Sequence, residues 1–136
     1  MKNMIGYFLF LFVVAGCNKE VNTLNDDLQG TWELKKSFSG WGGSYDYAPG
    51  NGNTISFNGN SFTQEIKTMD TAYTIHGSFS IHKDKPCASA QAQWLINMND
   101  DLFENSFRID NHELSIGATE CIADGGSSIY RKISDL

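Results

Sequence analysis

The stretch NTISFNGNSFTQEIK, residues 53–67, decides the fold that this sequence predicts. Its apolar side chains recur at every second position on both sides of Asn58-Gly59, a dipeptide typical of a two-residue hairpin turn. The positions that share one face are Ile55, Phe57, Phe62, Gln64 and Ile66. A period of two places alternate side chains on opposite faces of a strand. The stretch therefore predicts two antiparallel strands with one face toward a core.

The same alternation recurs along the rest of the chain, mostly between short turns. It is found in residues 31–35, 73–81, 94–98, 103–109, 114–116 and 127–133. No window has the 3.6-residue stripe of an amphipathic helix, and the chain contains only two prolines. We therefore predict an all-β fold over residues 28–134. Its expected form is an antiparallel up-and-down meander of about eight strands closed into a barrel, with a β-sandwich as the alternative.

The first residues have the pattern of an export signal. Lys2 precedes an apolar run from Met4 to Ala15, whose twelve residues fit the core of a signal peptide. A membrane-spanning helix needs roughly 18–20 apolar residues. The alternatives, an anchor helix or a strand of the domain, fit less well, because Lys19 and Glu20 end the run early and no turn joins it to the next strand.

Residues 13–17, Val-Val-Ala-Gly-Cys, resemble the lipobox of bacterial lipoproteins, in which two small residues precede a cysteine. Val14 stands where that family most often has Leu. The resemblance implies that residues 1–16 are a lipoprotein signal peptide and that Cys17 carries a diacylglycerol and an acylated amino group. Several acyl chains anchor a protein stably. The partner implied is therefore a membrane, held through the acyl chains on Cys17.

Residues 17–27 are expected to form the lipidated cysteine and a flexible polar tether, because the segment is polar and has no aromatic residue. Asn18 is not an aspartate-type retention signal. By resemblance to lipoprotein sorting, this favours anchoring in the outer membrane of the cell envelope. Periplasmic and surface-facing orientations both stay open.

Two cysteines remain, Cys87 and Cys121. In the oxidising compartment that an export signal implies, an even pair predicts a disulfide, with two free thiols or half of a metal site as alternatives. No Cys-x-x-Cys or His-x-x-His spacing supports a metal site, and we predict none. A strict eight-strand meander places the two cysteines at opposite ends of the barrel, although a disulfide needs Cα atoms within about 7 Å. Either residues 117–126 fold back, or the strand count is off by one, or the thiols do not pair.

Residues 28–34, Leu-Gln-Gly-Thr-Trp-Glu-Leu, resemble the opening of lipocalin-like domains, where Gly-x-Trp begins the first strand. Residues 124–131, with Asp-Gly-Gly and then Ile-Tyr-Arg, are similar to the last strand of small bacterial lipocalin-like lipoproteins. The resemblance implies a barrel whose last strand pairs with the first. It also implies that Arg131 lies against Trp32 and closes the barrel base, a cation–π contact worth about 0.5–2 kcal/mol. The alternative is a core Trp32 and a surface Arg131.

The glycine-rich segment 40–53 is long for a hairpin connection, and long loops are often lids or binding loops. In lipocalin-like barrels the first loop overhangs the open mouth. The candidates for contact with a ligand, a sugar or a protein partner are therefore Trp41, Tyr45 and Tyr47; alternatively they plug the mouth. Gln64 and Asn105 interrupt the apolar inward face and are candidate polar contacts in a pocket.

Charge and motif content restrict the function. The formal net charge of −6 argues against a nucleic-acid partner. His76 and His82 lie about 20 Å apart along a strand, too far to share a metal, and no serine lies in a Gly-x-Ser-x-Gly elbow. We therefore expect neither catalysis nor a cofactor.

Two functions remain. The sequence favours a lipid-anchored lipoprotein of the cell envelope that binds a small apolar or amphipathic ligand. The alternative is a non-catalytic accessory lipoprotein with a filled barrel, which presents its aromatic loop to an envelope protein.

Overall fold

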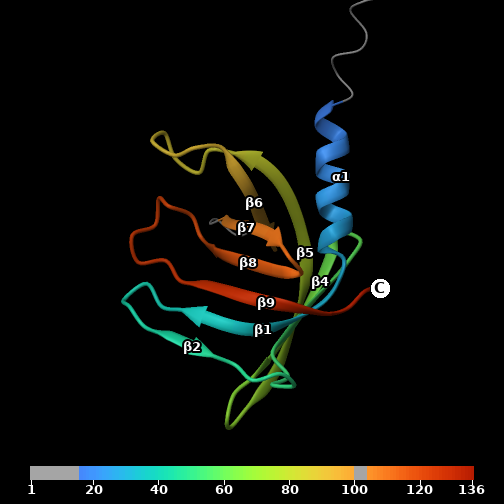
Figure 1. Ribbon diagram of the computed structural model, residues 1–136, viewed down its shortest axis with the longest axis vertical. Coiled ribbons are helices and arrows are strands. Elements are labelled where there is room, and N and C mark those ends of the chain that lie inside the picture. Colours follow the sequence, from blue (N-terminus) through green and yellow to red (C-terminus); the bar gives the residue numbers. More distant parts are fainter. Residues whose placement is uncertain (1–15, 100–103) are drawn as a thin grey trace, which may run out of the picture.

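The computed structural model describes residues 16–99 and 104–136, with side chains from Lys19 onward (Figure 1). These residues form one helix, α1 (Gly16–Leu28), and nine strands. The strands are β1 (Gly30–Phe38), β2 (Ser44–Asp46), β3 (Thr54–Asn58), β4 (Ser61–Lys67), β5 (Ala72–Asp84), β6 (Gln93–Met98), β7 (Asn105–Asp110), β8 (Glu113–Ala118) and β9 (Ser127–Ser134).

The strands form an antiparallel meander that closes on itself. Strands β3 to β9 follow one another in chain order, β1 pairs with β3, and β9 pairs back with β1, so the hydrogen bonds form a ring. The predicted all-β up-and-down barrel is therefore confirmed. The ring contains the eight strands expected from the sequence. The additional strand, β2, arises inside the predicted loop 40–53 and pairs with the far end of β1.

Side-chain alternation places one hydrophobic core inside the ring. The buried residues of this core are Leu28, Trp32, Ile55, Phe57, Phe62, Phe79, Ile96, Phe107, Leu114 and Tyr130. Phe57 and Phe79 pack edge to face, with ring centroids 4.9 Å apart. The indole of Trp32 is almost fully buried, and its Nε1 donates a hydrogen bond of 2.8 Å to the carbonyl of Leu28. The first strand is thus tied to the end of α1.

The segment 17–27, expected to be a flexible tether, is a helix in the structure. Val21, Leu24 and Leu28 follow one another at spacings of three and four, which places them on one helix face. Leu28 is fully buried and Leu24 packs against the core, with α1 lying beside β5 (Figure 1). The polar majority of the segment concealed this narrow apolar face. The predicted signal peptide lies, apart from Gly16, outside the described residues.

The seam between β1 and β9 closes the barrel with contacts other than the expected one. Trp32 is opposite Lys132, whose Nζ lies 5.3 Å from the centroid of the indole ring. Arg131 is opposite Glu33, and its Nε donates a hydrogen bond of 2.8 Å to the Glu33 carboxylate. The prediction of Arg131 against Trp32 is therefore wrong by one residue. The sequence motif located the strand but not its register, which a shift in the ladder after Thr31 determines.

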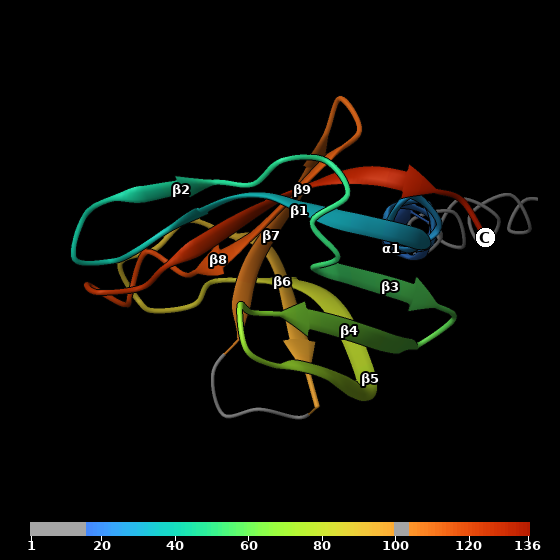
Figure 2. The ribbon, with the colours of Figure 1, turned by 90° about the horizontal axis from the view of Figure 1, so that it is seen from below.

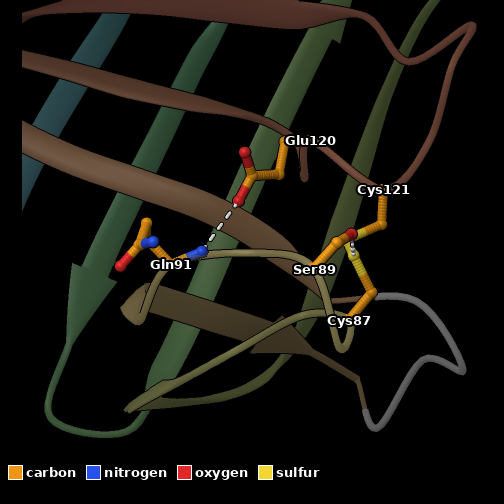
Figure 3. Close-up of a disulfide and its surroundings, with 5 residues drawn as sticks. All are labelled: Cys87, Ser89, Gln91, Glu120 and Cys121. Atoms are coloured by element: carbon orange, nitrogen blue, oxygen red, sulfur yellow. Dashed lines mark hydrogen bonds between the residues drawn. A yellow bond between two sulfur atoms is a disulfide. The ribbon is translucent and has the colours of Figure 1, made fainter.

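Cys87 and Cys121 form a disulfide with a Cα–Cα distance of 6.2 Å, as predicted (Figure 3). The geometric conflict is resolved by the directions in which the strands run (Figure 1). Figure 1 shows β5 rising steeply while β8 and β9 run across the view, so the loops after β5 and β8 reach the same side. The Gln91 amide N–H, which donates to Glu120 over 3.2 Å, joins the two loops a second time (Figure 3).

Candidate functional site

One end of the barrel opens into a pocket of about 320 Å³, which we call the mouth pocket. Its walls come from β1, β3, β4, β9 and the loop that joins β2 to β3. Leu34, Ile66 and the ring of Tyr130 supply apolar surface, while the exposed Glu65 and Lys67 lie at the rim. A volume of this size is at the lower end of the range for small-molecule sites.

Hydroxyl groups gather on one wall of the mouth pocket. Ser37 and Ser128 are opposite each other across the β1–β9 seam. The Tyr47 hydroxyl lies 3.3 Å from Oγ of Ser37, and the Tyr130 hydroxyl is hydrogen-bonded to Ser128. Burial raises the pKa of Tyr130, and the Ser128 hydrogen bond opposes this only in part. The Tyr130 hydroxyl is therefore a neutral hydrogen-bonding group at physiological pH.

An irregularity in β1 brings Leu34 and Ser37 to the same pocket. The partners on β9 are consecutive, Tyr130 and then Ile129, but the partners on β1 skip Lys35. Such a β-bulge shifts the following residues to the other face of the strand. Ser37 therefore faces the pocket, where an unbroken strand would have turned it away. The combination of apolar and hydroxyl-bearing groups suits a small amphipathic molecule.

The structure separates the residues that the sequence nominated. Tyr47 and Gln64 both line the mouth pocket. Trp41 and Tyr45, by contrast, are 86% and 67% exposed and do not line it. Asn105 is opposite Ile96 on β6 and Ala118 on β8. It lines neither the mouth pocket nor two other hollows, one beside α1 and one across β6 to β9.

Sequence reasoning missed Ser37, Ser128 and Tyr130. The available signal was weak: the Lys35-Lys36 pair interrupts the alternation of Trp32 and Leu34, which is how a bulge appears in a sequence. Ser128 and Tyr130 do alternate, but only the closed ring brings them next to β1.

Residues 47–53, which we call the strap, join β2 to β3 (Figure 2). Glu33 faces outward on β1 yet is only 4% exposed, because the strap covers it. Burial raises the pKa of the Glu33 carboxyl, but hydrogen bonds from Arg131 and from the amides of Gly50 and Gly52 outweigh it, so the pKa is lowered. Nη2 of Arg131 also donates to the Tyr47 carbonyl over 3.2 Å.

Two further hollows lie elsewhere. One, of about 510 Å³, lies between α1 and the side chain of Trp94. The other, of about 380 Å³, is lined by residues of β6, β7, β8 and β9. In residues 16–99 and 104–136, no three His, Cys, Asp or Glu side chains lie close enough to hold a metal ion. No helix in this described part of the chain has the length and apolar character to cross a membrane.

These features define the class of fold: a small closed meander barrel whose first and last strands pair, with a pocket at one end. A lipocalin-like protein from Bacteroides uniformis shares the fold, with a TM-score of 0.53 and 19% sequence identity. The match covers 79% of this chain and 99% of the other. No family model matches the chain, and no curated protein matches it. At this identity the likeness shows a lipocalin-like fold and nothing of the ligand.

Proposed function

We propose that this protein is a lipid-anchored lipoprotein of the cell envelope whose barrel binds a small apolar or amphipathic ligand in the mouth pocket, without catalysis. The observation that carries the proposal is the pocket itself. Its apolar surface from Leu34 and Ile66 lies beside the hydroxyls of Tyr47 and Tyr130. Ligand sites in proteins combine a mainly apolar lining with a few placed polar groups in this way.

Binding of the neutral fluorophore N-phenyl-1-naphthylamine to the soluble chain from Asn18 onward tests the ligand site. We expect saturable fluorescence enhancement, and a Kd that is about tenfold higher in Tyr47→Ala, since one aromatic contact and one hydroxyl are lost. Tyr45→Ala is the matched control, because Tyr45 lies two residues before Tyr47, on β2, and does not line the pocket. Equal effects of the two substitutions, or no saturable binding, would contradict the proposal.

The anchoring part of the proposal rests on the lipobox-like residues before Cys17. Metabolic labelling with a radioactive fatty acid should mark the wild-type chain, and fractionation should recover it with outer membranes. Cys17→Ser should lose the label and retain residues 1–16, because the thiol is the nucleophile that takes the diacylglycerol. Unchanged labelling of Cys17→Ser would refute lipidation at this position.

The exposed aromatic loop favours a second candidate, docking of an envelope protein. Trp41 and Tyr45 are the most exposed aromatic side chains of the described part of the chain, and Phe38 lies close by in sequence at 38% exposed. Gly40 packs so tightly on the carbonyl of Asp124 that a Cβ atom would lie 2.0 Å from its oxygen, so a second loop supports the aromatic one. A photo-crosslinking residue at position 41 should give one discrete crosslinked species in cells. The same residue at position 115 is the control.

A further inference from the structure

One attachment of the strap to the barrel is the ion pair between Glu33 and Arg131. Glu33 and Arg131 are already partners in the β1–β9 ladder, where backbone hydrogen bonds join the two strands from residue 31 to residue 38. Beyond this ladder, the contacts of the two side chains go to the strap. The pair therefore adds a connection to the strap that the seam itself lacks.

The contacts of the ion pair cover most of the strap. Arg131 holds its first carbonyl, that of Tyr47, and Glu33 accepts hydrogen bonds from the amides of Gly50 and Gly52. Both glycines have a φ of 79°, a backbone conformation that side chains disfavour and that turns both amides toward one carboxylate. The Glu33 and Arg131 side chains are only 6% and 24% exposed, so their hydrogen bonds are shielded from water.

The opposite side of the strap belongs to the mouth pocket. The Tyr47 side chain lines the pocket beside Ser37, and Asn53 lines it next to β4, where its Oδ1 accepts a hydrogen bond of 2.8 Å from the Lys67 amide. Movement of the strap away from Arg131 at Tyr47 therefore also moves one wall of the pocket.

Other ties of the strap bypass the ion pair. The Tyr47 amide donates to the Lys35 carbonyl, and the Tyr47 hydroxyl lies 3.3 Å from Oγ of Ser37. Nδ2 of Asn51 donates to the Leu34 carbonyl, and the Leu34 amide donates to the Asn53 carbonyl over 2.8 Å.

We infer that Glu33 and Arg131 are positioning residues: from the outer wall of the barrel they fasten the strap from Tyr47 to Gly52, and so they fix Tyr47 over the mouth pocket and control access to it. This inference rests on the proposed ligand site for its functional meaning. Its geometry, however, can be tested without any ligand.

Two measurements on the full-length chain in dodecyl maltoside test the inference. The first is hydrogen–deuterium exchange of the strap amides, and the second is the rate at which tetranitromethane nitrates Tyr47 and Tyr130, read by mass spectrometry. In Arg131→Gln we expect both rates to rise about tenfold, the effect of losing charge-assisted hydrogen bonds that hold a surface segment. Tyr45, already exposed, serves as the internal reference and should nitrate at an unchanged rate.

Arg131→Gln leaves a buried carboxylate without its cation and can destabilise the whole barrel. The double variant Glu33→Gln/Arg131→Gln avoids the unpaired charge and should give the same local rise. Arg108→Gln is the control, because Arg108 is a largely exposed arginine paired with Asp110 and distant in sequence from the strap.

Three results would overturn the inference. They are unchanged strap exchange in both variants, a rise spread equally over the amides of β3 to β8, or faster strap exchange with unchanged nitration of Tyr47 and Tyr130. If the fluorophore does not bind, the proposed ligand site is refuted. The exchange and nitration measurements do not depend on a ligand, so they still test whether the ion pair holds the strap.

Discussion

Trp32 and Glu33 are neighbours on β1 that face opposite sides, and both are buried. The core covers the indole, whereas the strap covers the carboxylate. Burying an unpaired carboxylate costs several kcal/mol, so Glu33 is tolerated only because Arg131 and two strap amides satisfy it. Since the pKa of Glu33 is lower in the folded chain than its usual 4.5, ionised Glu33 stabilises the fold.

This stabilisation should depend on pH. It is fully present above the unfolded pKa of 4.5 and is lost as the pH falls through the lower folded value. We expect Glu33→Gln to lower the free energy of unfolding at pH 7 by about 1–3 kcal/mol and to flatten its decline below pH ~5. Urea unfolding across pH 3–7 measures this. Asp135→Asn is the control, because Asp135 also has a lowered pKa but is exposed. A Glu33→Gln profile parallel to the wild type would contradict the expectation.

Trp32 offers a second test at this scale. Trp32→Phe keeps a ring in the core but removes the donor to the Leu28 carbonyl and leaves a void. We expect a loss of about 2–3 kcal/mol in the free energy of unfolding, from a buried acceptor without its partner and lost packing. Trp41→Phe, at an exposed position, should change it by less than about 0.5 kcal/mol. Similar values for the two variants in guanidinium unfolding would show that the indole hydrogen bond carries no weight.

At the scale of elements, the sequence predicted those strands and turns that depend on a pattern of neighbouring residues. The strands around Asn58-Gly59 could be located because alternation and turn chemistry lie within a few residues of each other. Helix α1 was missed because three apolar residues among thirteen do not stand out until they meet a core. The contact of Arg131 was misplaced because register depends on pairing with a strand about a hundred residues away. Long-range pairing is the information that a local pattern lacks.

The disulfide is the element-scale feature with the clearest energetic prediction. Cys87 and Cys121 are 34 residues apart in sequence, and closing a loop of that length in the unfolded chain contributes about 3–4 kcal/mol in the chain-entropy model. The double variant Cys87→Ser/Cys121→Ser should unfold at a correspondingly lower denaturant concentration. Wild-type protein with reductant is the matched comparison and should behave alike. Equal midpoints for the oxidised protein and the variant would show that the cross-link adds no stability.

At the scale of the molecule, the mouth pocket is a product of ring closure. Leu34 and Ser37 come from the first strand, Gln64 from the middle of the chain and Tyr130 from the last strand. The sequence could nominate Gln64, since it interrupts an apolar face, and Tyr47, since it lies in an unusual loop. It could not nominate Tyr130, because the resemblance paired the last strand with the first but did not give the register that places Tyr130 opposite Leu34.

The ring also makes the last strand indispensable to the fold. A chain that ends at Gly126 loses β9, which exposes the edges of β1 and β8, removes Tyr130 from the core and leaves Glu33 buried without Arg131. We expect this chain to lack near-ultraviolet circular dichroism and a cooperative thermal transition. A chain that ends at Ser134 loses only the ion pair that the exposed Asp135 makes with Lys132 and the terminal leucine, so its stability should fall by less than about 0.5 kcal/mol. Cooperative unfolding of the chain without β9 would mean that the remaining strands close by themselves, and that the β1–β9 seam is an addition to the barrel and not its final step.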